Sequence, residues 1–121
     1  MKLKVLTVRK EGGWNSEYVD LEVTEACDLV YYAVCDTTYT AENKISNKLR
    51  HTFWFPRTSV QKGDFVRLYT RAKRSTDQSS GKNGAGTTTH LFYWGLQTAV
   101  WNDEGDGVLL FQITTWKATR A

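Results

Sequence analysis

Short runs in which apolar and polar residues alternate constrain the fold of this 121-residue chain more than any other feature of its sequence. In residues 18–24, Val19, Leu21 and Val23 occupy every second position, which is the pattern of a strand with one buried face. Similar runs, rich in Val, Thr, Tyr, Trp and Phe, recur along the sequence. They predict strands at 3–9, 18–24, 29–36, 50–55, 64–71, 90–101 and 107–116. We therefore expect an all-β fold.

Turn-forming residues separate these runs. A glycine pair at 12–13 and a Gly-, Ser- and Thr-rich segment at 75–89 are typical of turns, and the longer segment reads as a flexible loop. Residues 41–49 are the one weak helical candidate, and a structured loop is an equal alternative. Seven short strands in a chain of this length predict one β-sandwich or small barrel over residues 1–121.

Neither a membrane segment nor a targeting segment is evident. The longest apolar run, residues 29–35, is too short to span a bilayer, and the apolar stretch near the N-terminus is too short for a signal peptide. A soluble protein without a membrane partner, cytoplasmic by default, is the expectation. Cys27 and Cys35 flank what reads as one strand, so two reduced, buried thiols are expected rather than a disulfide.

The net charge of +3 conceals an uneven distribution. Residues 44–74 contain nine basic residues and one acidic residue, a net charge of +8, whereas residues 1–43 carry a net charge of −4. A block this one-sided attracts anions if its side chains share a surface. The alternative is that the block pairs with the acidic first third in ordinary surface salt bridges, which contribute little to stability.

Four motifs between residues 17 and 111 occur in the order typical of one known family. They are Glu17-Tyr18-Val19, the run Leu29 to Asp36, Phe55-Pro56 followed by Gly63-Asp64, and Trp101-Asn102-Asp103-Glu104-Gly105-Asp106 before Leu110. In these motifs the chain resembles the lamin tail domain, as a divergent, bacterial-type, stand-alone member. The resemblance implies an immunoglobulin-like β-sandwich that acts as a binding module rather than an enzyme. Members of that family bind proteins and DNA or accompany nucleases and other hydrolases.

The last of these motifs also has a direct structural interpretation. Asn and Asp side chains bond the backbone of tight turns, and Gly105 supplies a positive φ that other residues adopt at a cost. Trp101 would anchor the turn to the core, as large aromatic side chains do. We therefore interpret these residues as determinants of the fold rather than as a functional site.

The sequence contains no catalytic constellation. His51 and His90 each begin a predicted strand, and neither has a nucleophile or a paired carboxylate at a meaningful spacing, so both are expected to be packing residues. The acidic turn at 102–106 is similar to a calcium loop, but Ile113 stands where the bidentate Glu should be, which leaves only a loose contact with a divalent ion as an alternative. We therefore expect no enzyme activity, no cofactor and no bound metal.

The basic block offers the better candidate site. If Phe53 and Phe55 point inward, the outward positions of 50–55 and 64–71 alternate arginine with exposed aromatic rings on one sheet face. Arginines would contact phosphates and rings would stack on bases, so we expect weak, sequence-independent binding of nucleic acid or another polyanion. The alternative is a solvent-facing surface on which guanidinium groups cover the rings. The candidate residues are Arg50, Trp54, Arg67, Tyr69, Arg71, Lys73 and Arg74.

Two other kinds of partner stay open. Exposed aromatic residues suit a sugar polymer, with Trp54 as the main candidate, although Trp94 and Trp116 could belong to the core with Trp101. Aromatic anchors surrounded by arginines also suit a protein partner. The run at 107–116 is apolar on both faces, so it could lie inside a sheet or pair with a second copy in a homodimer.

Overall fold

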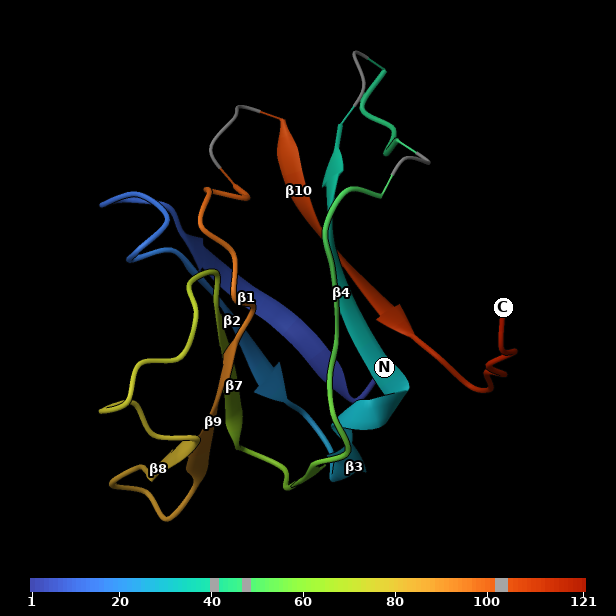
Figure 1. Cartoon of the computed structure of the whole chain (residues 1–121). Helices are drawn as coiled ribbons and strands as arrows, with labels where there is room; N and C mark the ends of the chain where they lie inside the picture. The colour runs from blue at the N-terminus through green and yellow to red at the C-terminus, as the bar shows by residue number, and fades with distance from the viewer. Residues whose placement is uncertain (40–41, 47–48, 102–104) are drawn as a thin grey trace.

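The computed structural model describes residues 1–39, 42–46, 49–101 and 105–121 (Figure 1). In chain order the elements are β1 (Leu3–Arg9), β2 (Tyr18–Val23), β3 (Cys27–Asp28), the 3₁₀ turn η1 (Leu29–Tyr31), β4 (Tyr32–Thr38), β5 (Thr52–Trp54), β6 (Ser59–Val60), β7 (Phe65–Tyr69), β8 (Ser80–Lys82), β9 (Thr88–Tyr93) and β10 (Asp106–Gln112). The predicted all-β class is confirmed. Within these ranges, no helix is long and apolar enough to cross a membrane.

The named strands form three sheets. The largest has the order β1-β2-β7-β9-β8, the second has the order β10-β4-β5, and β3 pairs with β6. Neighbouring strands run antiparallel, with β7 and β9 as a parallel pair. This parallel pair departs from the purely antiparallel sheets of the immunoglobulin sandwich.

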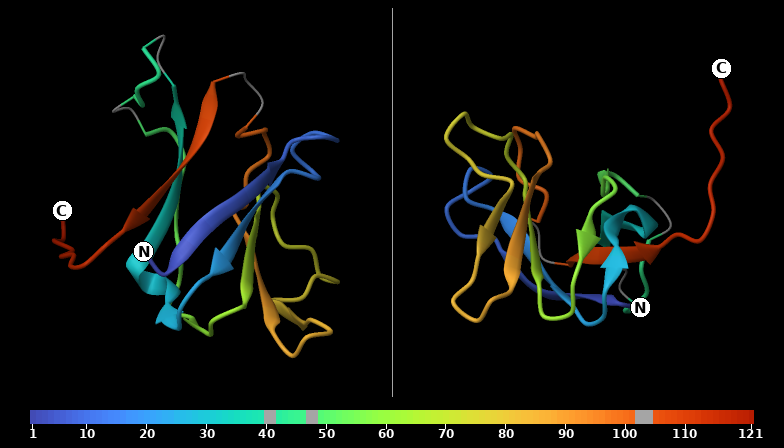
Figure 2. Two further views of the ribbon diagram at one scale, coloured as in Figure 1. Left: turned by 180° about the vertical axis from the view of Figure 1, so that it is seen from behind. Right: turned by 90° about the horizontal axis from the view of Figure 1, so that it is seen from below.

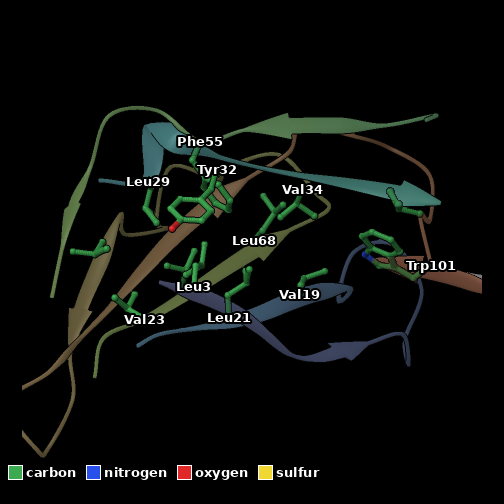
Figure 3. Packing of buried hydrophobic residues seen from close by; sticks show 13 residues of the cluster. Leu3, Val19, Leu21, Val23, Leu29, Tyr32, Val34, Phe55, Leu68 and Trp101 are labelled. Atoms are coloured by element: carbon green, nitrogen blue, oxygen red, sulfur yellow. The ribbon is translucent and has the colours of Figure 1, made fainter. Parts of the chain in front are cut away.

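The core lies between the two larger sheets. Figure 3 shows Leu3, Leu21 and Val19 of one sheet facing Tyr32 and Val34 of the other. All five side chains are at most 1% exposed and belong to one buried cluster. Complete burial of a side chain of this size contributes about 1.5–3 kcal/mol. It also fixes the strand register, because a shift by one residue would turn each buried side chain to solvent.

Aspartate changes the start of the third predicted strand. The Asp28 carboxylate accepts a hydrogen bond from the Val30 N–H at 2.9 Å and caps η1, so β4 begins at Tyr32 rather than at residue 29. The same carboxylate accepts the Thr58 N–H at 3.0 Å. Burial raises the pKa of Asp28, but these two backbone bonds and Arg57 outweigh that effect and lower it.

Loops replace parts of the last two predicted strands. The chain leaves the sheet after β9 and again after β10, so the predictions 90–101 and 107–116 were both too long. Conversely, β8 lies within 75–89, where only a flexible loop was predicted. Of the weak helical candidate 41–49, the described residues form no helix, and an isolated bridge joins Tyr39 to Ile45. The C-terminal segment leaves the body of the molecule beyond β10 (Figure 2).

The motif around residue 101 is described in part. Trp101 is 2% exposed, which confirms its predicted place in the core, and Gly105 has the predicted positive φ, at +88°. Residues 102–104 lie outside the described residues, so the turn itself and its acidic side chains stay predictions. Cys27 is half-buried, Cys35 is buried, and they form no disulfide.

Candidate functional site

The predicted site residues fall into two separate regions. Trp54 lies on β5, at the edge of the three-stranded sheet, and Arg50 precedes that strand. Arg67 and Tyr69 lie on β7, which is inside the five-stranded sheet. The two strands therefore do not present one continuous face, and that part of the prediction was wrong. The hydrophobic pattern identifies which face of a strand points outward but not which sheet the strand joins.

Rings and guanidinium groups alternate on the five-stranded sheet. The Arg67 guanidinium carbon lies 3.8 Å from the Tyr18 ring centroid. The Arg71 guanidinium carbon lies 4.6 Å from the Tyr69 centroid and 5.2 Å from that of Tyr93, and these two rings stack at 5.3 Å. We call these five residues the arginine–tyrosine ladder. A cation–π contact stabilises by about 0.5–1 kcal/mol at an exposed site and by about 2 kcal/mol where the groups are removed from water.

Both ladder arginines are paired with carboxylates. Arg67 donates two hydrogen bonds to Asp20, at 2.7 and 2.9 Å, and these bonds raise the pKa of Arg67 above its ordinary value. Arg71 donates to Asp77 at 2.5 and 3.3 Å, and it is buried, at 8% exposure, rather than outward as predicted. Asp20 and Asp77 already neutralise these two guanidinium groups. This arrangement agrees with the alternative interpretation of the sequence, in which the guanidinium groups cover the aromatic rings. A polyanion would therefore have to displace a bidentate partner to reach either one.

Asp77 fixes the loop that follows β7. Its carboxylate also accepts the Arg74 N–H at 2.7 Å, and the Tyr93 hydroxyl donates to the Gln78 carbonyl at 2.9 Å. The hydrogen bond from Arg71, followed by that from the Arg74 N–H, lowers the pKa of Asp77, so its carboxylate stays charged near neutral pH. The ladder therefore holds this loop against the sheet and sets the position of Lys73 and Arg74.

A shallow groove of about 210 Å³ lies beside this loop. We call it the basic groove; it is lined by Trp14, Asn15, Arg71, Ala72, Lys73, Arg74, Leu96 and Gln97. Lys73 and Arg74 are exposed and form no side-chain salt bridge within the described part of the chain. Trp14 was not predicted as a site residue. The glycines at 12 and 13, with φ of +85° and +77°, form the turn that leads into it.

Trp54 belongs to a second, aromatic region. Its ring is 46% exposed, and its indole Nε1 donates to the Val30 carbonyl at 2.7 Å. The Trp116 ring lies 5.0 Å away at 86°, and the Tyr31 ring lies 5.9 Å from Trp116 at 60°. Trp116 is 44% exposed, so its suggested place in the core was wrong, whereas half-buried Trp94 packs against the core.

Two histidine–carboxylate pairs were missed by sequence reasoning. His90 Nε2 lies 3.0 Å from Asp64 Oδ2, and His51 Nδ1 lies 3.4 Å from Asp36 Oδ1. The partners are 26 and 15 residues apart and meet only when the chain folds. Asp64 also accepts the N–H groups of Gln61, in the loop before β7, and of Thr88, at the start of β9, at 3.0 Å each, which indicates a structural role for this pair.

Acid should weaken the fold through Asp64. Burial raises the pKa of this carboxyl, but the N–H groups of Gln61 and Thr88 and the side chain of His90 outweigh burial and lower it. A lowered pKa contributes stability above the unfolded value near 3.8, and that stability is lost as the pH falls through the folded value. We expect Asp64→Asn to cost about 1–2 kcal/mol at pH 7 and to flatten the decline in stability below about pH 4. Urea unfolding at several pH values measures both effects, and an unchanged acid slope would contradict the assignment.

Comparisons with known proteins identify no family. No protein-family model matches the chain, and no curated protein matches it. The resemblance to lamin tail domains stays a prediction carried by the motifs in the sequence. Among the described residues, no three His, Cys, Asp or Glu side chains are grouped so that they could hold a metal ion.

Proposed function

We propose that the chain is a non-enzymatic binding module of the lamin-tail, immunoglobulin-like type, and that it binds single-stranded nucleic acid through the basic groove. One observation carries the proposal: Trp14 lines the same groove as Arg71, Lys73 and Arg74. A groove with exposed cations and an aromatic ring suits a strand of phosphates and bases. The burial of Glu17, Asp36 and Trp101, all from the family-like motifs, is compatible with the proposed fold type.

Each groove residue has a distinct role. Lys73 and Arg74 contact phosphates, because their side chains are exposed and form no salt bridge within the described ranges. Trp14 stacks on a base, which stabilises by about 1–3 kcal/mol and tolerates any base. Arg71 is a positioning residue, since its bonds to Asp77 hold the loop. None of these contacts requires the edge of a base, so binding is independent of sequence.

The double variant Lys73→Ala/Arg74→Ala should weaken binding with little loss of stability. If each side chain contacts one phosphate, the slope of log K against log salt should become less steep by about 1.4. Fluorescence polarisation with a labelled oligothymidylate, across a salt series, measures this slope. Lys62→Ala/Arg120→Ala is the matched control, because it removes the same charge from exposed positions outside the groove. Equal effects in both variants would show that binding depends only on the net charge of the chain, which would contradict a site in the groove.

Trp14→Ala distinguishes this function from the alternatives. We expect affinity for the oligothymidylate to fall by roughly tenfold, because one stacking contact is lost. A sugar-binding module would instead bind polysaccharide in a pull-down at any salt concentration, and this binding would be lost in Trp54→Ala.

A protein partner, including a second copy, has a candidate surface in β10, which is a seven-residue strand at a sheet edge. Sedimentation at several protein concentrations would detect such a dimer.

A further inference from the structure

The edge strands of the two larger sheets differ in how well they are protected against pairing with another chain. Natural edge strands avoid such pairing by being short, by carrying charges or by bulging. β5 and β8 have three residues each, and β1 carries Lys4 and Arg9 and has a register shift against β2. β10 has seven residues in an unbroken register with β4, and it contains no charged residue after Asp106 and no proline. Of the edges that the described strands form, β10 is therefore the one open to pairing.

One side of β10 carries backbone groups that β4 does not use. The Ile113 N–H, directly after β10, donates to the Tyr31 carbonyl at 2.7 Å. Bonded and non-bonded positions alternate along an antiparallel pair, so residues 107, 109 and 111 bond to β4, and the N–H and C=O groups of residues 108, 110 and 112 point away from it. Among the described strands, β10 pairs with β4 alone. The segment after β10 runs toward the other edge of this sheet, where Trp116 packs on Trp54.

We propose that β10 pairs with the same strand of a second copy of this chain, antiparallel and about a twofold axis at Leu109. In this register all seven residues of both strands are paired, and Val108 exchanges two backbone hydrogen bonds with the partner's Leu110. A shift by one residue would place bonded positions opposite non-bonded ones, and a shift by two would leave residues at the ends unpaired. The dimer joins the two three-stranded sheets into one continuous sheet.

The side chains of β10 are complementary to themselves in this register. On the face away from the core, Gly107 lies opposite the partner's Phe111, and the two Leu109 side chains meet on the axis. Phe111 is 37% exposed, and Gly107 has no side chain to exclude its ring. The Tyr39 ring lies against Gly107 and is 47% exposed, so it offers the incoming ring an aromatic contact. The two Asp106 residues stand at opposite ends of the paired strands, about 20 Å apart, where salt screens their repulsion.

The monomer–dimer equilibrium of the full chain, without nucleic acid, tests the proposal. Sedimentation equilibrium should show a dimer with a Kd in the micromolar range, as expected for a small interface. Leu109→Lys should weaken the dimer at least about tenfold, because it places two like charges directly opposite each other on the axis. Leu6→Lys is the matched control, because Leu6 is 45% exposed on β1, at a different sheet edge. A chain that stays monomeric up to about 1 mM, or equal effects of the two variants, would overturn the proposal.

A cysteine at the axis tests the register and does not depend on how well Leu109→Lys folds. Opposite Cβ atoms at a non-hydrogen-bonded position lie about 4.5 Å apart, close to what a disulfide requires. Leu109→Cys, oxidised with copper phenanthroline, should therefore give a disulfide-linked dimer. Leu6→Cys and the parent chain, which has only Cys27 and Cys35, should stay unlinked. Equal linking of all three chains, or no linking of Leu109→Cys, would overturn a twofold axis at Leu109.

Amide hydrogen exchange tests the same pairing in the parent chain. The Leu110 N–H becomes bonded only in the dimer, so its exchange should slow as the protein concentration rises, whereas exchange at Lys4 on β1 should not change. Exchange at Leu110 that is independent of concentration would contradict the pairing. β10 contributes no residue to the basic groove, so Lys73→Ala/Arg74→Ala should leave the dimer intact. Failure of the dimer and failure of nucleic-acid binding are therefore distinguishable.

Discussion

Glu17→Ala is expected to lower the free energy of unfolding by about 4 kcal/mol. The Glu17 side chain is 1% exposed, and its carboxylate accepts hydrogen bonds from the Thr70 hydroxyl at 2.6 Å and from the N–H groups of Val100 and Trp101 at 2.8 and 3.2 Å. Alanine would leave three buried donors without an acceptor. The loss is a large part of the stability of an ordinary domain, about 5–15 kcal/mol, so the melting temperature should fall by roughly 15 °C.

Three comparison variants identify the cause. Glu17→Gln keeps one acceptor oxygen and nearly the same volume, so it should lose about half as much stability. Thr70→Val removes a single donor together with its need for an acceptor, and it should cost less again. Glu25→Ala, at an exposed position, should stay within about 0.5 kcal/mol of the parent chain in urea unfolding. A small effect of Glu17→Ala would show that water replaces the carboxylate.

The parts of the fold that could be predicted from sequence are those set by local pattern. Alternation in β2 gave the correct buried set, because a half-buried strand must place every second side chain in the core. In β7, Val66 and Leu68 also stand two positions apart, and both are buried. Trp101 was placed in the core correctly because so large an apolar surface is rarely left in water.

The parts that could not be predicted depend on which segments meet in space. The pairing of Arg71 with Asp77 turns an apparently outward arginine into a buried one and fixes a loop that composition alone marks as flexible. β5 and β7 lie in different sheets, and the alternation of residues within a strand does not reveal which sheet the strand joins. Trp14 was missed for the same reason, because the groove joins residues about 60–80 positions apart along the chain.

Trp101→Ala is the second change expected to have a large effect, again about 4 kcal/mol. Trp101 is 2% exposed and is the largest of the fully buried side chains (Figure 3). Its ring lies 6.2 Å from that of Trp94, which in turn lies 6.1 Å from that of Phe53 on β5. Alanine would leave a cavity in this aromatic contact path between the 94–101 loop and the three-stranded sheet. Trp101→Phe should cost less, because the ring is largely kept and the indole Nε1 has no hydrogen-bond partner among the described residues.

The two large effects should not be additive. Glu17 binds the backbone N–H of residue 101 and so holds the segment that carries the Trp101 ring. Once the ring is removed, that segment relaxes and the carboxylate has less to hold in place. We therefore expect the double variant Glu17→Ala/Trp101→Ala to cost about 1–2 kcal/mol less than the sum of the single losses, as for other residues that share a contact. A double-mutant cycle in urea, with Glu17→Gln and Trp101→Phe as milder substitutions in case the double variant does not fold, measures this coupling. Strict additivity would mean that the carboxylate and the ring stabilise the sandwich independently.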